Sequence, residues 1–357
     1  MTLSASKKTT MKAVVYDGPY KISLQDRPIP ELQAETDIIV KVKFTALCGS
    51  ELHVYRGHQP STTGFIMGHE FTGIVEEVGS QVKTVKVGDR IVSPFTVSCL
   101  ECFYCKNGYS SRCTKGLLLG SAGLDGAQAE FVRVPLADGT VMKASPALKD
   151  NALVLMADIF PTGFFGATNA FKHFTPEQVA EATVVVVGCG PVGLCAILAA
   201  STFKPKHLFA VDSVDSRLEL AEGLGAEPLN FMKNKEQMER RIKEVTDGRG
   251  ADAVIEVVGL KPALKTAFDL IRPWGVISSI GVHNDEASLC NQAYNKNLRI
   301  QMGRCPVRSI FPEALKMLEE KQDHLSFMFD KIMPLSEAVE GYELFDKMQV
   351  QKVIFQC

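Results

Sequence analysis

Four cysteines stand close together in the chain, in the pattern Cys-x2-Cys-x2-Cys-x7-Cys, at Cys99, Cys102, Cys105 and Cys113. Four thiolates in one loop can close a tetrahedron around Zn²⁺ and leave no open position, as structural zinc sites do. Iron–sulfur clusters also use closely spaced cysteines, but nothing else in the chain indicates electron transfer. The spacing therefore favours a structural zinc, whose loss would unfold a lobe rather than stop a chemical step.

A second set of zinc-ligand residue types is spread over a longer stretch of the chain. Cys48 begins the segment Cys-Gly-Ser-Glu-Leu-His, which also contains Ser50 and His53, and a Gly-His-Glu segment follows with His69 and Glu70. Thiolate, imidazole and carboxylate are the groups that bind Zn²⁺ in proteins. Taken alone, a buried cysteine usually packs as a small apolar residue, and a single histidine is usually structural. This group therefore needs support from other motifs.

A glycine-rich segment indicates a dinucleotide site. The apolar run Thr183–Val187 leads directly into Gly-Cys-Gly-Pro-Val-Gly and then into the apolar helical stretch Leu194–Ala200. In this context the first glycine permits a tight turn, the second lets the backbone approach a pyrophosphate, and the third lets helix and strand pack closely. The phosphates would lie on the amides at the positive end of the helix. The residues expected to bind the cofactor here are Gly188, Gly190, Pro191, Val192 and Gly193.

An acidic residue follows where this motif needs one. Asp212 ends the next apolar run, Phe-Ala-Val-Asp, and would accept hydrogen bonds from the adenosine ribose hydroxyls. A carboxylate there would repel a 2′-phosphate, which favours NAD(H) over NADP(H). The alternative is an aspartate that only caps the next helix. Arg217 lies one helical turn later, and contact with the ribose and a role as surface charge are equally compatible with its position.

The elements that must position these residues change in character along the chain. The first third predicts strands at Met11–Tyr16, Asp37–Phe44, Phe71–Gly79 and Arg90–Val92, typical of a compact antiparallel barrel or sandwich with functional loops. Beyond about residue 160 the chain alternates short apolar strands with helical stretches such as Leu218–Leu224 and Lys235–Val245. This alternation predicts a parallel, doubly wound sheet. Its strands are expected at Thr183–Val187, Leu208–Val211, Ala253–Val258, Val276–Ile280 and Leu298–Gln301.

Composition limits the class of protein. A chain of 357 residues favours two domains. The net charge of −2 argues against nucleic-acid or anionic-membrane partners, and no apolar run is long enough to cross a bilayer. The segment Met1–Thr10 lacks the apolar core of a secretory signal, and we expect a frayed lead-in there. Ten cysteines without a signal suggest a reducing, cytoplasmic location, where clustered thiols bind metal.

Taken together, the Cys-Gly-Ser-x-x-His segment, the Gly-His-Glu segment, the cysteine lobe and the dinucleotide motif resemble the medium-chain, zinc-containing alcohol and polyol dehydrogenase family. The resemblance covers essentially the whole chain after residue 11. It implies an α/β protein with a GroES-like, β-rich catalytic domain and a Rossmann cofactor domain. We expect the first domain to span 1–160 and 306–357 and the second to span 161–305.

The resemblance also implies a catalytic zinc held by Cys48 and His69, with Glu70 beside it as a neighbour or transient ligand. The third firm ligand comes from the segment Met-Ala-Asp-Ile-Phe-Pro-Thr-Gly, where Asp158 stands in place of the cysteine of alcohol-type members. The segment looks like that of the formaldehyde dehydrogenase branch. Thr162, four residues later, matches a residue that packs against the nicotinamide, although a turn residue before Gly163 is the alternative.

A proton path follows from the same match. Ser50 and His53 would carry the substrate proton from the hydroxyl, through the cofactor ribose, to solvent, and a histidine suits this task because its pKa lies near neutrality. An ordinary surface histidine is the alternative for His53. Gly49 stands where alcohol-type members often carry a basic residue for the pyrophosphate, and Lys352 is a candidate for that missing charge. The Cys-Gly-Ser-x-x-His form is shared with polyol and threonine dehydrogenases.

These features predict a zinc-dependent oxidoreductase that transfers a hydride between an alcohol, or the matching aldehyde or ketone, and NAD(H). A polyol or amino-alcohol dehydrogenase is the first alternative. A zinc-independent enone or quinone reductase would lack the zinc ligands, and a non-catalytic NAD sensor would have a defective site. The expected ligands are two zinc ions per chain, NAD and a small-molecule substrate. A homo-oligomer is expected, with a tetramer favoured over a dimer.

Overall fold

The computed structural model describes residues 9–284 and 289–357. Of the lead-in expected at Met1–Thr10, residues 1–8 lie outside the described residues, and Thr10 itself begins strand β1 (Thr10–Gly18). Among the described residues, none of the helices combines the length and the apolar character that crossing a membrane requires.

The chain divides into two compact units. The first contains the chain up to Asp158 together with Pro306–Pro312 and Leu325–Cys357. The second contains Ile159–Cys305 and Glu313–His324. The units differ from the expected domains at Ile159 and Phe160 and in the segment Glu313–His324, all of which group with the second unit instead of the first. Each unit has hydrophobic cores of its own.

The first unit is built on β-sheets, as the apolar runs of the first third predict. A two-stranded sheet pairs β1 with β2, and a larger sheet has the order β14-β15-β3-β4-β5-β7, with β6 also paired to β3. Its remaining strands are β2 (Lys21–Pro28), β3 (Ile38–Leu47), β4 (Glu70–Val78), β5 (Arg90–Ser93), β6 (Phe131–Val134), β7 (Met142–Lys143), β14 (Ile332–Pro334) and β15 (Val353–Gln356). The four strands expected from the sequence are present as β1, β3, β4 and β5.

Short helices connect these strands. They are α1 (Gly49–Tyr55), α2 (Phe103–Lys106), α3 (Ala137–Thr140), α4 (Asp150–Leu153) and α13 (Ala338–Asp346), with 3₁₀ turns at Ser110–Arg112, Val154–Ala157, Gln322–Phe329 and Leu335–Glu337. Strand β3 alternates buried and exposed side chains in its middle, so that Val40 and Val42 enter a core while Lys41 and Lys43 face solvent. This core, which also contains Phe71, anchors the strands that carry the first functional residues.

The second unit is a six-stranded parallel sheet of order β10-β9-β8-β11-β12-β13. Its strands are β8 (Thr183–Val187), β9 (His207–Asp212), β10 (Glu227–Asn230), β11 (Ala251–Glu256), β12 (Ile271–Ser279) and β13 (Arg299–Met302). The order runs outward in both directions from a switch point between β8 and β11, which is the doubly wound Rossmann topology. The five strands expected from the sequence are all present, and β10 is an addition.

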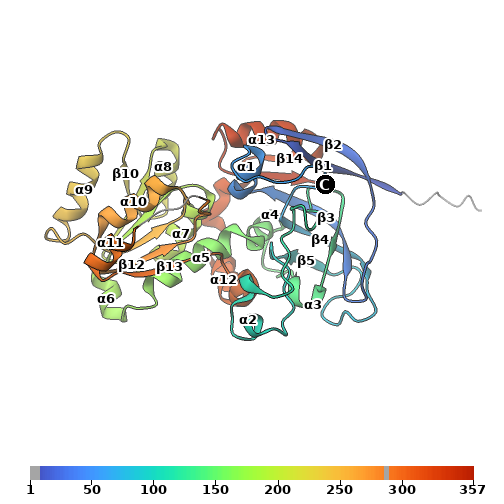
Figure 1. The fold of residues 1–357 in the computed structure, drawn as a ribbon, viewed down its shortest axis with the longest axis horizontal. Helices are drawn as coiled ribbons and strands as arrows, with labels where there is room; N and C mark the ends of the chain where they lie inside the picture. The colour runs from blue at the N-terminus through green and yellow to red at the C-terminus, as the bar shows by residue number, and fades with distance from the viewer. Residues whose placement is uncertain (1–8, 285–288) are drawn as a thin grey trace, which may run out of the picture. The chain divides into compact units, whose positions relative to one another are not determined.

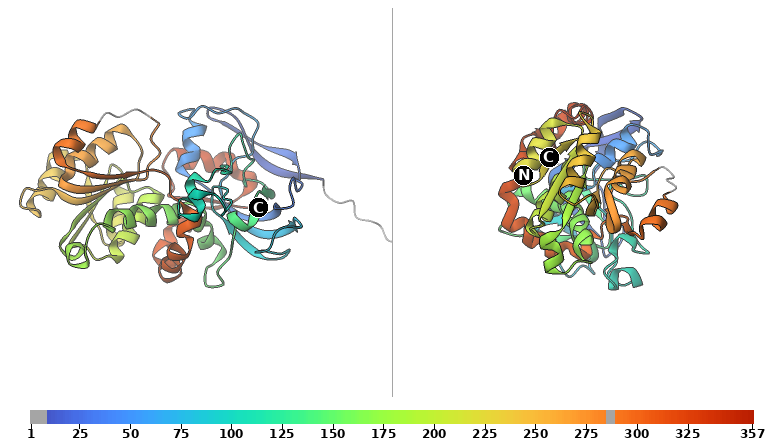
Figure 2. Two further views of the ribbon diagram at one scale, coloured as in Figure 1. Left: turned by 60° about the horizontal axis from the view of Figure 1, so that its bottom comes forward. Right: turned by 90° about the vertical axis from the view of Figure 1, so that its left-hand side faces the viewer.

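Helices cover both faces of this sheet, because side chains along each strand alternate between the faces. Val185, Phe209 and Val254 pack with Phe268 of α10 in one core. On the opposite face, α5 lies so close to the sheet that Gly166 faces Ile255 and Ile280 directly. Figure 2 shows the orange helices and the green helices on opposite sides of the sheet, and Figure 1 labels them. The helices of this unit are α5 (Ile159–Phe171), α6 (Pro176–Glu181), α7 (Pro191–Thr202), α8 (Asp215–Gly223), α9 (Lys235–Glu244), α10 (Lys261–Leu270) and α11 (Cys290–Lys296). Helix α12 (Val307–Lys321) begins among residues of the first unit and ends among residues of the second.

Candidate metal centres and cofactor site

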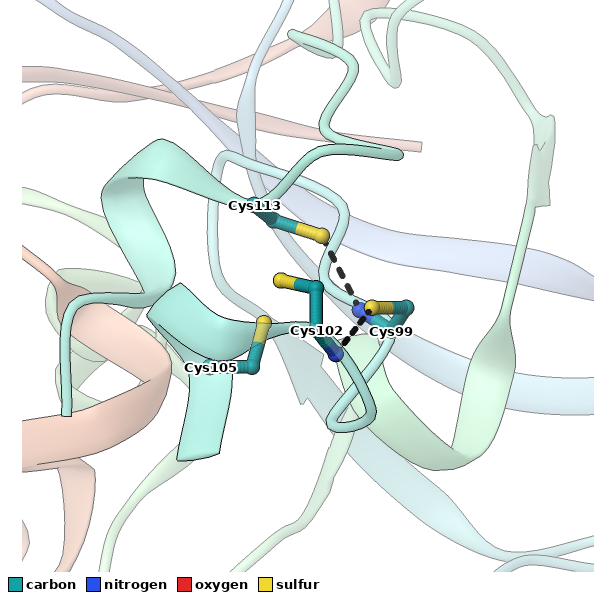
Figure 3. A group of neighbouring side chains, drawn as sticks. All are labelled: Cys99, Cys102, Cys105 and Cys113. Atoms are coloured by element: carbon teal, nitrogen blue, oxygen red, sulfur yellow. Dashed lines mark hydrogen bonds between the residues drawn. The ribbon is translucent and has the colours of Figure 1, made fainter. Parts of the chain in front are cut away.

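The four closely spaced cysteines form one cluster in the first unit. Cys102 precedes the short helix α2, Cys105 lies within it, and Cys99 and Cys113 flank this turn of chain. Their sulfur atoms all lie within 4.8 Å of one another, and Figure 3 shows the four side chains pointing toward a common centre. All four residues are half-buried, which suits a lobe that is held by its own ligands rather than by a core.

Backbone amides donate hydrogen bonds to the sulfur atoms of this cluster and so stabilise their thiolate form. The Cys99 amide donates to the Cys113 sulfur at 3.3 Å, and the Cys102 amide donates to the Cys99 sulfur at 3.4 Å. Backbone hydrogen bonds from Cys105 and Thr114 lower the pKa of the Cys102 thiol to about 6, whereas burial and the neighbouring Cys102 raise the pKa of Cys105 to about 12. Four thiolates together thus need a cation, and a metal deprotonates the thiols that bind it.

The second cluster gathers residues that are far apart in the sequence. Strands β3 and β4 pair antiparallel with Ala46 opposite Glu70, so Cys48, just beyond the end of β3, comes to lie beside His69. The 3₁₀ turn Val154–Ala157 delivers Asp158 to the same place. The ligand atoms of Cys48, His69, Glu70 and Asp158 all lie within 4.8 Å of one another. All three firm ligands predicted for a catalytic zinc are therefore brought together.

The contacts within this cluster converge on the Asp158 carboxylate. Its Oδ2 atom lies 3.2 Å from His69 Nε2 and 3.7 Å from the Cys48 sulfur. All four residues are buried, and Oε1 of Glu70 has no hydrogen-bond partner among the described residues. Such a buried, unpartnered acceptor costs free energy unless a cation or a polar ligand satisfies it. The donor set and this orphan oxygen both fit a zinc ion.

The buried acidic groups of the cluster repel one another, and a bound cation would relieve this repulsion. Burial raises the pKa of the Cys48 thiol, and the charges of Glu70 and Asp158 raise it further. Burial raises the pKa of Glu70 above its ordinary value even though the Lys352 ammonium lowers it. For His69, burial alone would lower the pKa, but Glu51, Asp158 and Cys48 outweigh it and hold the pKa well above the ordinary value. The acidic groups Cys48, Glu51, Glu70 and Asp158 therefore outnumber the two basic groups beside them, His69 and Lys352.

One residue that the sequence analysis overlooked completes this arrangement. The carboxylate of Glu51, in the first turn of α1, accepts a hydrogen bond from the Cys48 amide at 2.8 Å and lies 3.5 Å from His69 Nδ1. A carboxylate on the second ring nitrogen fixes the orientation and tautomer of a metal-binding histidine. The signal was present in the sequence, because Glu51 stands three residues after Cys48, where a first-turn acid can reach back to the amide that begins a helix.

A further polar contact supports Glu51 from behind. Gln128 donates from its side-chain amide to Glu51 Oε1 at 3.4 Å, and the Tyr342 hydroxyl donates to Gln128 Oε1 at 2.9 Å. These two residues lie 77 and 214 positions from their partners in the chain, and both are buried. No local pattern marks them, so only the fold reveals them.

The structure corrects the suggestion that Lys352 meets the pyrophosphate. Its side chain is fully buried in the first unit, where the ammonium forms an ion pair with Glu70 Oε2. Burial lowers the pKa of Lys352, but Glu70 and the neighbouring Cys48 raise it above its ordinary value, so the group is a cation. An ammonium that is committed to a buried carboxylate is not available to a phosphate in solvent.

Ser50 and His53 both lie on α1, three positions apart, which places them on one face of the helix. Both side chains are partly exposed. Burial, with the neighbouring charges of His58 and Arg56, lowers the pKa of His53 below its ordinary value. The lowered pKa favours the neutral form of the His53 imidazole, which can accept a proton. The Phe95 ring packs edge-on against His69 with 5.9 Å between the ring centroids.

The dinucleotide motif has the geometry that its glycines predict. Gly188 has a positive φ of +99° and begins the turn after β8. A side chain at Gly193 would meet the Gly188 carbonyl oxygen at 1.9 Å, which explains the third glycine, while nothing in the chain lies within 4 Å of the position a Gly190 side chain would take. Gly190 precedes α7 without a capping side chain, and Pro191 opens the helix. The free amide end of α7 is thus suited to an anion.

Asp212, the acidic residue of the motif, is hydrogen-bonded to the glycine turn. Asp212, at the end of β9, accepts hydrogen bonds from the amides of Cys189, Ser213 and Val214 at 2.7 to 2.9 Å. Oδ1 accepts from both Ser213 and Val214, whereas Oδ2 accepts only from Cys189 and keeps a lone pair for a ribose hydroxyl. Arg217 lies half-buried in α8 and lowers the pKa of Cys189, although burial and Asp212 keep that pKa raised.

Thr162 lies inside helix α5 and is buried, so it is not the turn residue that was the alternative. The glycine that follows it allows close packing, because a side chain at Gly163 would meet the Ala196 amide of α7 at 2.6 Å. Helix α5 is thereby held against the helix that begins at the dinucleotide turn.

Comparisons with known proteins agree with both halves of the structure. Residues 34–145 match a model described as an alcohol dehydrogenase GroES-like domain, and residues 191–320 match one described as zinc-binding dehydrogenase. A zinc-type alcohol dehydrogenase B of Aspergillus flavus is 64% identical over 353 residues, which covers 99% of this chain and 82% of the relative. The chain belongs to the medium-chain, zinc-dependent alcohol dehydrogenase family.

Two other similar proteins extend this result. A medium chain reductase/dehydrogenase of an Acremonium species is 60% identical over 277 residues, covering 77% of this chain and 95% of that protein. The solved structure of an alcohol dehydrogenase from a Thermus species aligns with a TM-score of 0.88 at 33% identity and covers 97% of this chain and 99% of that one. The protein is thus an NAD-linked, zinc-dependent alcohol oxidoreductase, and the expected GroES-like and Rossmann folds are confirmed.

Proposed function

We propose that Cys48, His69 and Asp158 hold the zinc at which this dehydrogenase interconverts an alcohol and an aldehyde or ketone. The observation that carries the proposal is the convergence of their ligand atoms, with that of Glu70, within 4.8 Å in a buried site. One thiolate, one carboxylate and one neutral imidazole balance the charge of Zn²⁺. Three protein ligands also leave the fourth position of a tetrahedron for substrate, as catalytic zinc sites do.

The metal supplies a Lewis acid, which lowers the pKa of an alcohol hydroxyl or polarises a carbonyl, while NAD accepts or returns the hydride. The chain's own residues then manage orientation and protons. Glu51 fixes the His69 ring through Nδ1 so that Nε2 faces the metal. Ser50 receives the proton from the substrate hydroxyl, and the partly buried, neutral His53 passes it toward solvent.

Glu70 has a separate task in this proposal. Lys352 holds one of its carboxylate oxygens, while the other, Oε1, is unpartnered among the described residues. The free oxygen would be available as a further ligand to a zinc ion held at this site, while Lys352 keeps the other oxygen in place. Glu70 is thus a transient ligand rather than a permanent one.

A second zinc, bound by Cys99, Cys102, Cys105 and Cys113, would hold the lobe around α2. The convergence of four sulfur atoms and the amide hydrogen bonds to them support this site. Zinc is favoured over an iron–sulfur cluster by the spacing of the ligands, although both use thiolates. The proposal is therefore two zinc ions per chain with unequal roles.

NAD is the expected cofactor rather than NADP. The Asp212 carboxylate at the end of β9 would accept ribose hydroxyls and repel a 2′-phosphate. Gly188, Gly190, Pro191, Val192 and Gly193 would bind the pyrophosphate, with Arg217 near the ribose and Thr162 against the nicotinamide.

The substrate is proposed as a primary or secondary alcohol. Asp158, in place of a third thiolate ligand, favours a member that handles aldehydes, whereas the Cys48-Gly49-Ser50 form favours a polyol or amino-alcohol substrate. The complete ligand set argues against a zinc-independent reductase and against a non-catalytic NAD sensor, because both would lack it.

We further propose a cytoplasmic homo-oligomer, with a tetramer favoured over a dimer. Strand β13 is a sheet edge whose four residues are exposed, and Trp274 and Tyr294 are 63% and 82% exposed in the same unit. An unprotected edge with apolar side chains pairs readily with a second copy. The cysteine lobe offers a different apolar surface through Phe103 and Tyr109. Two distinct surfaces fit the two interface types of a tetramer. Reduced thiols for metal binding suit a reducing compartment.

Metal analysis and turnover test the proposal together. We expect two zinc ions per chain, NADH-dependent reduction of at least one carbonyl compound, and loss of activity with retention of one zinc in Asp158→Ala. A metal-replete chain that reduces no member of a broad aldehyde and ketone panel would contradict the assignment of this site. Size-exclusion chromatography with light scattering tests the tetramer.

A further inference from the structure

A buried polar cluster in the second unit has no part in the metal sites. Glu256 ends strand β11 and is fully buried, Ser279 ends the neighbouring strand β12 and is also fully buried, and His283 follows four residues later with a side chain 19% exposed. The Ser279 hydroxyl donates to Glu256 Oε2 at 2.7 Å. The His283 Nε2 atom lies 2.8 Å from the Ser279 hydroxyl and 3.2 Å from Glu256 Oε2.

The Glu256 carboxylate is the centre of this cluster. Its other oxygen, Oε1, accepts hydrogen bonds from the amides of Val258 and Gly259 at 2.8 and 2.7 Å. Burial alone would raise the pKa of Glu256, but His283, Ser279 and the two amides outweigh it and hold the pKa below its ordinary value. A carboxylate that gathers four donors at the ends of two strands fastens the two following turns to each other.

The two turns are in direct backbone contact. A side chain at Gly281 would meet the Gly259 amide nitrogen at 2.1 Å, and one at Gly259, whose φ is +81°, would meet the Val282 amide nitrogen at 2.4 Å. The Ile280 amide also donates to the Glu256 carbonyl at 2.9 Å. Backbones this close leave little room for the two turns to move relative to each other. The hydrogen bonds among Glu256, Ser279 and His283 hold the same two turns together from one side.

The position of these two turns, after β11 and β12, indicates which half of the cofactor they would contact. The glycine turn and Asp212 belong to the first half of the sheet and would take the adenosine side of the dinucleotide. The second nucleotide of the cofactor must therefore lie on the turns that follow β11 and β12. The turn after β11 borders the glycine turn, because a side chain at Gly188 would meet Val258 Cγ2 at 2.5 Å. Leu260 and Val282, at the two turns, are 48% and 43% exposed and offer apolar surface to a ring.

We propose that Glu256, Ser279 and His283 act as a clamp that positions the nicotinamide half of the cofactor site. The clamp holds the Ile280–His283 backbone against Gly259 before the cofactor arrives, so the wall that receives the nicotinamide nucleotide is already in place. Preorganisation of this kind raises affinity by avoiding the cost of ordering on binding. These are positioning residues, since the Nε2 atom of His283 is committed to Ser279 and Glu256. The inference rests on the proposed use of NAD.

The test compares two ligands that differ only by the nicotinamide ring. ADP-ribose contains the adenosine, the pyrophosphate and the second ribose of NADH but lacks that ring. In the zinc-loaded holoenzyme, His283→Ala should weaken NADH binding roughly tenfold, because it removes a hydrogen bond to a charged group, and should leave ADP-ribose affinity unchanged. His283→Gln, which keeps an N–H donor, should recover part of the loss. His324→Ala, an exposed histidine of the same unit, is the matched control.

The outcomes are separable. Equal weakening of NADH and ADP-ribose by His283→Ala would indicate general disturbance of the unit, and no change in either would indicate an idle cluster, so both overturn the clamp. Ser279→Ala provides a second variant and should show the same selective loss. If the unaltered enzyme binds neither ligand, the proposed NAD site itself fails, which is a different result from failure of the clamp.

Discussion

The two candidate metal clusters of the first unit are assembled in opposite ways. The cysteine lobe takes four like ligands from one short segment, half-buried, with its own backbone amides supporting the sulfur atoms. The other cluster takes unlike ligands from β3, β4 and the turn before Asp158, and every one of them is buried. Its supporting residues, Glu51 and Lys352, come from further elements again. A site closed by four thiolates from one segment is typical of a structural zinc. A site with mixed ligands and an unpartnered oxygen is typical of a catalytic zinc.

The largest effect should follow from removing a ligand of the buried cluster. Asp158→Ala removes the carboxylate that lies 3.2 Å from His69 Nε2 and 3.7 Å from the Cys48 sulfur. Turnover should therefore fall by about a thousandfold or more, as loss of a metal's charge stabilisation does. Steady-state kinetics and zinc analysis measure it. The lobe zinc should remain, and the matched variant Asp150→Ala, at an exposed site on α4, should keep its activity. Full activity in Asp158→Ala would contradict the catalytic role of the buried cluster.

The cysteine lobe should respond in stability instead of chemistry. Cys105→Ser leaves three thiolates and should lower the thermal unfolding midpoint by several degrees, because metal binding there contributes folding free energy. Differential scanning calorimetry of the zinc-loaded protein measures the shift. Cys290→Ser, an exposed cysteine of the second unit, is the control and should unfold as the unaltered protein does. An unchanged midpoint with one zinc lost would mean that the lobe is not stabilised by metal.

A smaller loss should follow from the support behind His69. Glu51→Gln keeps the shape but removes the charge that faces His69 Nδ1, and partners of this kind are worth about 10- to 100-fold in metal affinity or activity. Competition with a zinc chelator measures the affinity of the buried site. Glu340→Gln, at an exposed position on α13, is the control. Equal zinc affinity in Glu51→Gln and the unaltered protein would remove Glu51 from the metal centre.

The smallest effect concerns the proton path. Because burial holds the pKa of His53 below the ordinary value of 6.5, its neutral form persists as pH falls, and alcohol oxidation should lose activity only below that value. His53→Gln should slow oxidation by about tenfold and abolish this acid limb. His58→Gln removes a neighbouring charge that lowers the His53 pKa, so the limb should move slightly to higher pH. A pH profile that is identical in all three proteins would exclude His53 from the path.

The contrast between the clusters also explains what the sequence could predict. The spacing of the four cysteines from Cys99 to Cys113 was enough to predict that they lie in one cluster. The strand–turn–helix context was likewise enough to predict the glycine turn after β8. Cys48, His69 and Asp158 were placed together only by family resemblance, because the chain distances between them carry no geometric information. The β3–β4 register brings the first two side by side.

The residues that were missed or misplaced share one property. Gln128 and Tyr342 act through contacts 77 and 214 positions away along the chain, and Lys352 reaches Glu70 across 282 positions. A lysine near the end of a chain is usually solvated, so its burial against a carboxylate could not be read from composition. The strand β15, which follows Lys352, pairs with β3 and carries it there.

The separation between ligands has a consequence for how the enzyme acquires its metals during synthesis. The sulfur ligands of the lobe leave the ribosome almost together, so this site can load zinc on a nascent chain. Cys48 must instead wait for Asp158, 110 residues later, and the counter-charge for Glu70 follows it by 282 residues. Closing such long loops is slow. We therefore expect a chain truncated before Lys352 to carry the lobe zinc while the buried cluster remains unfinished.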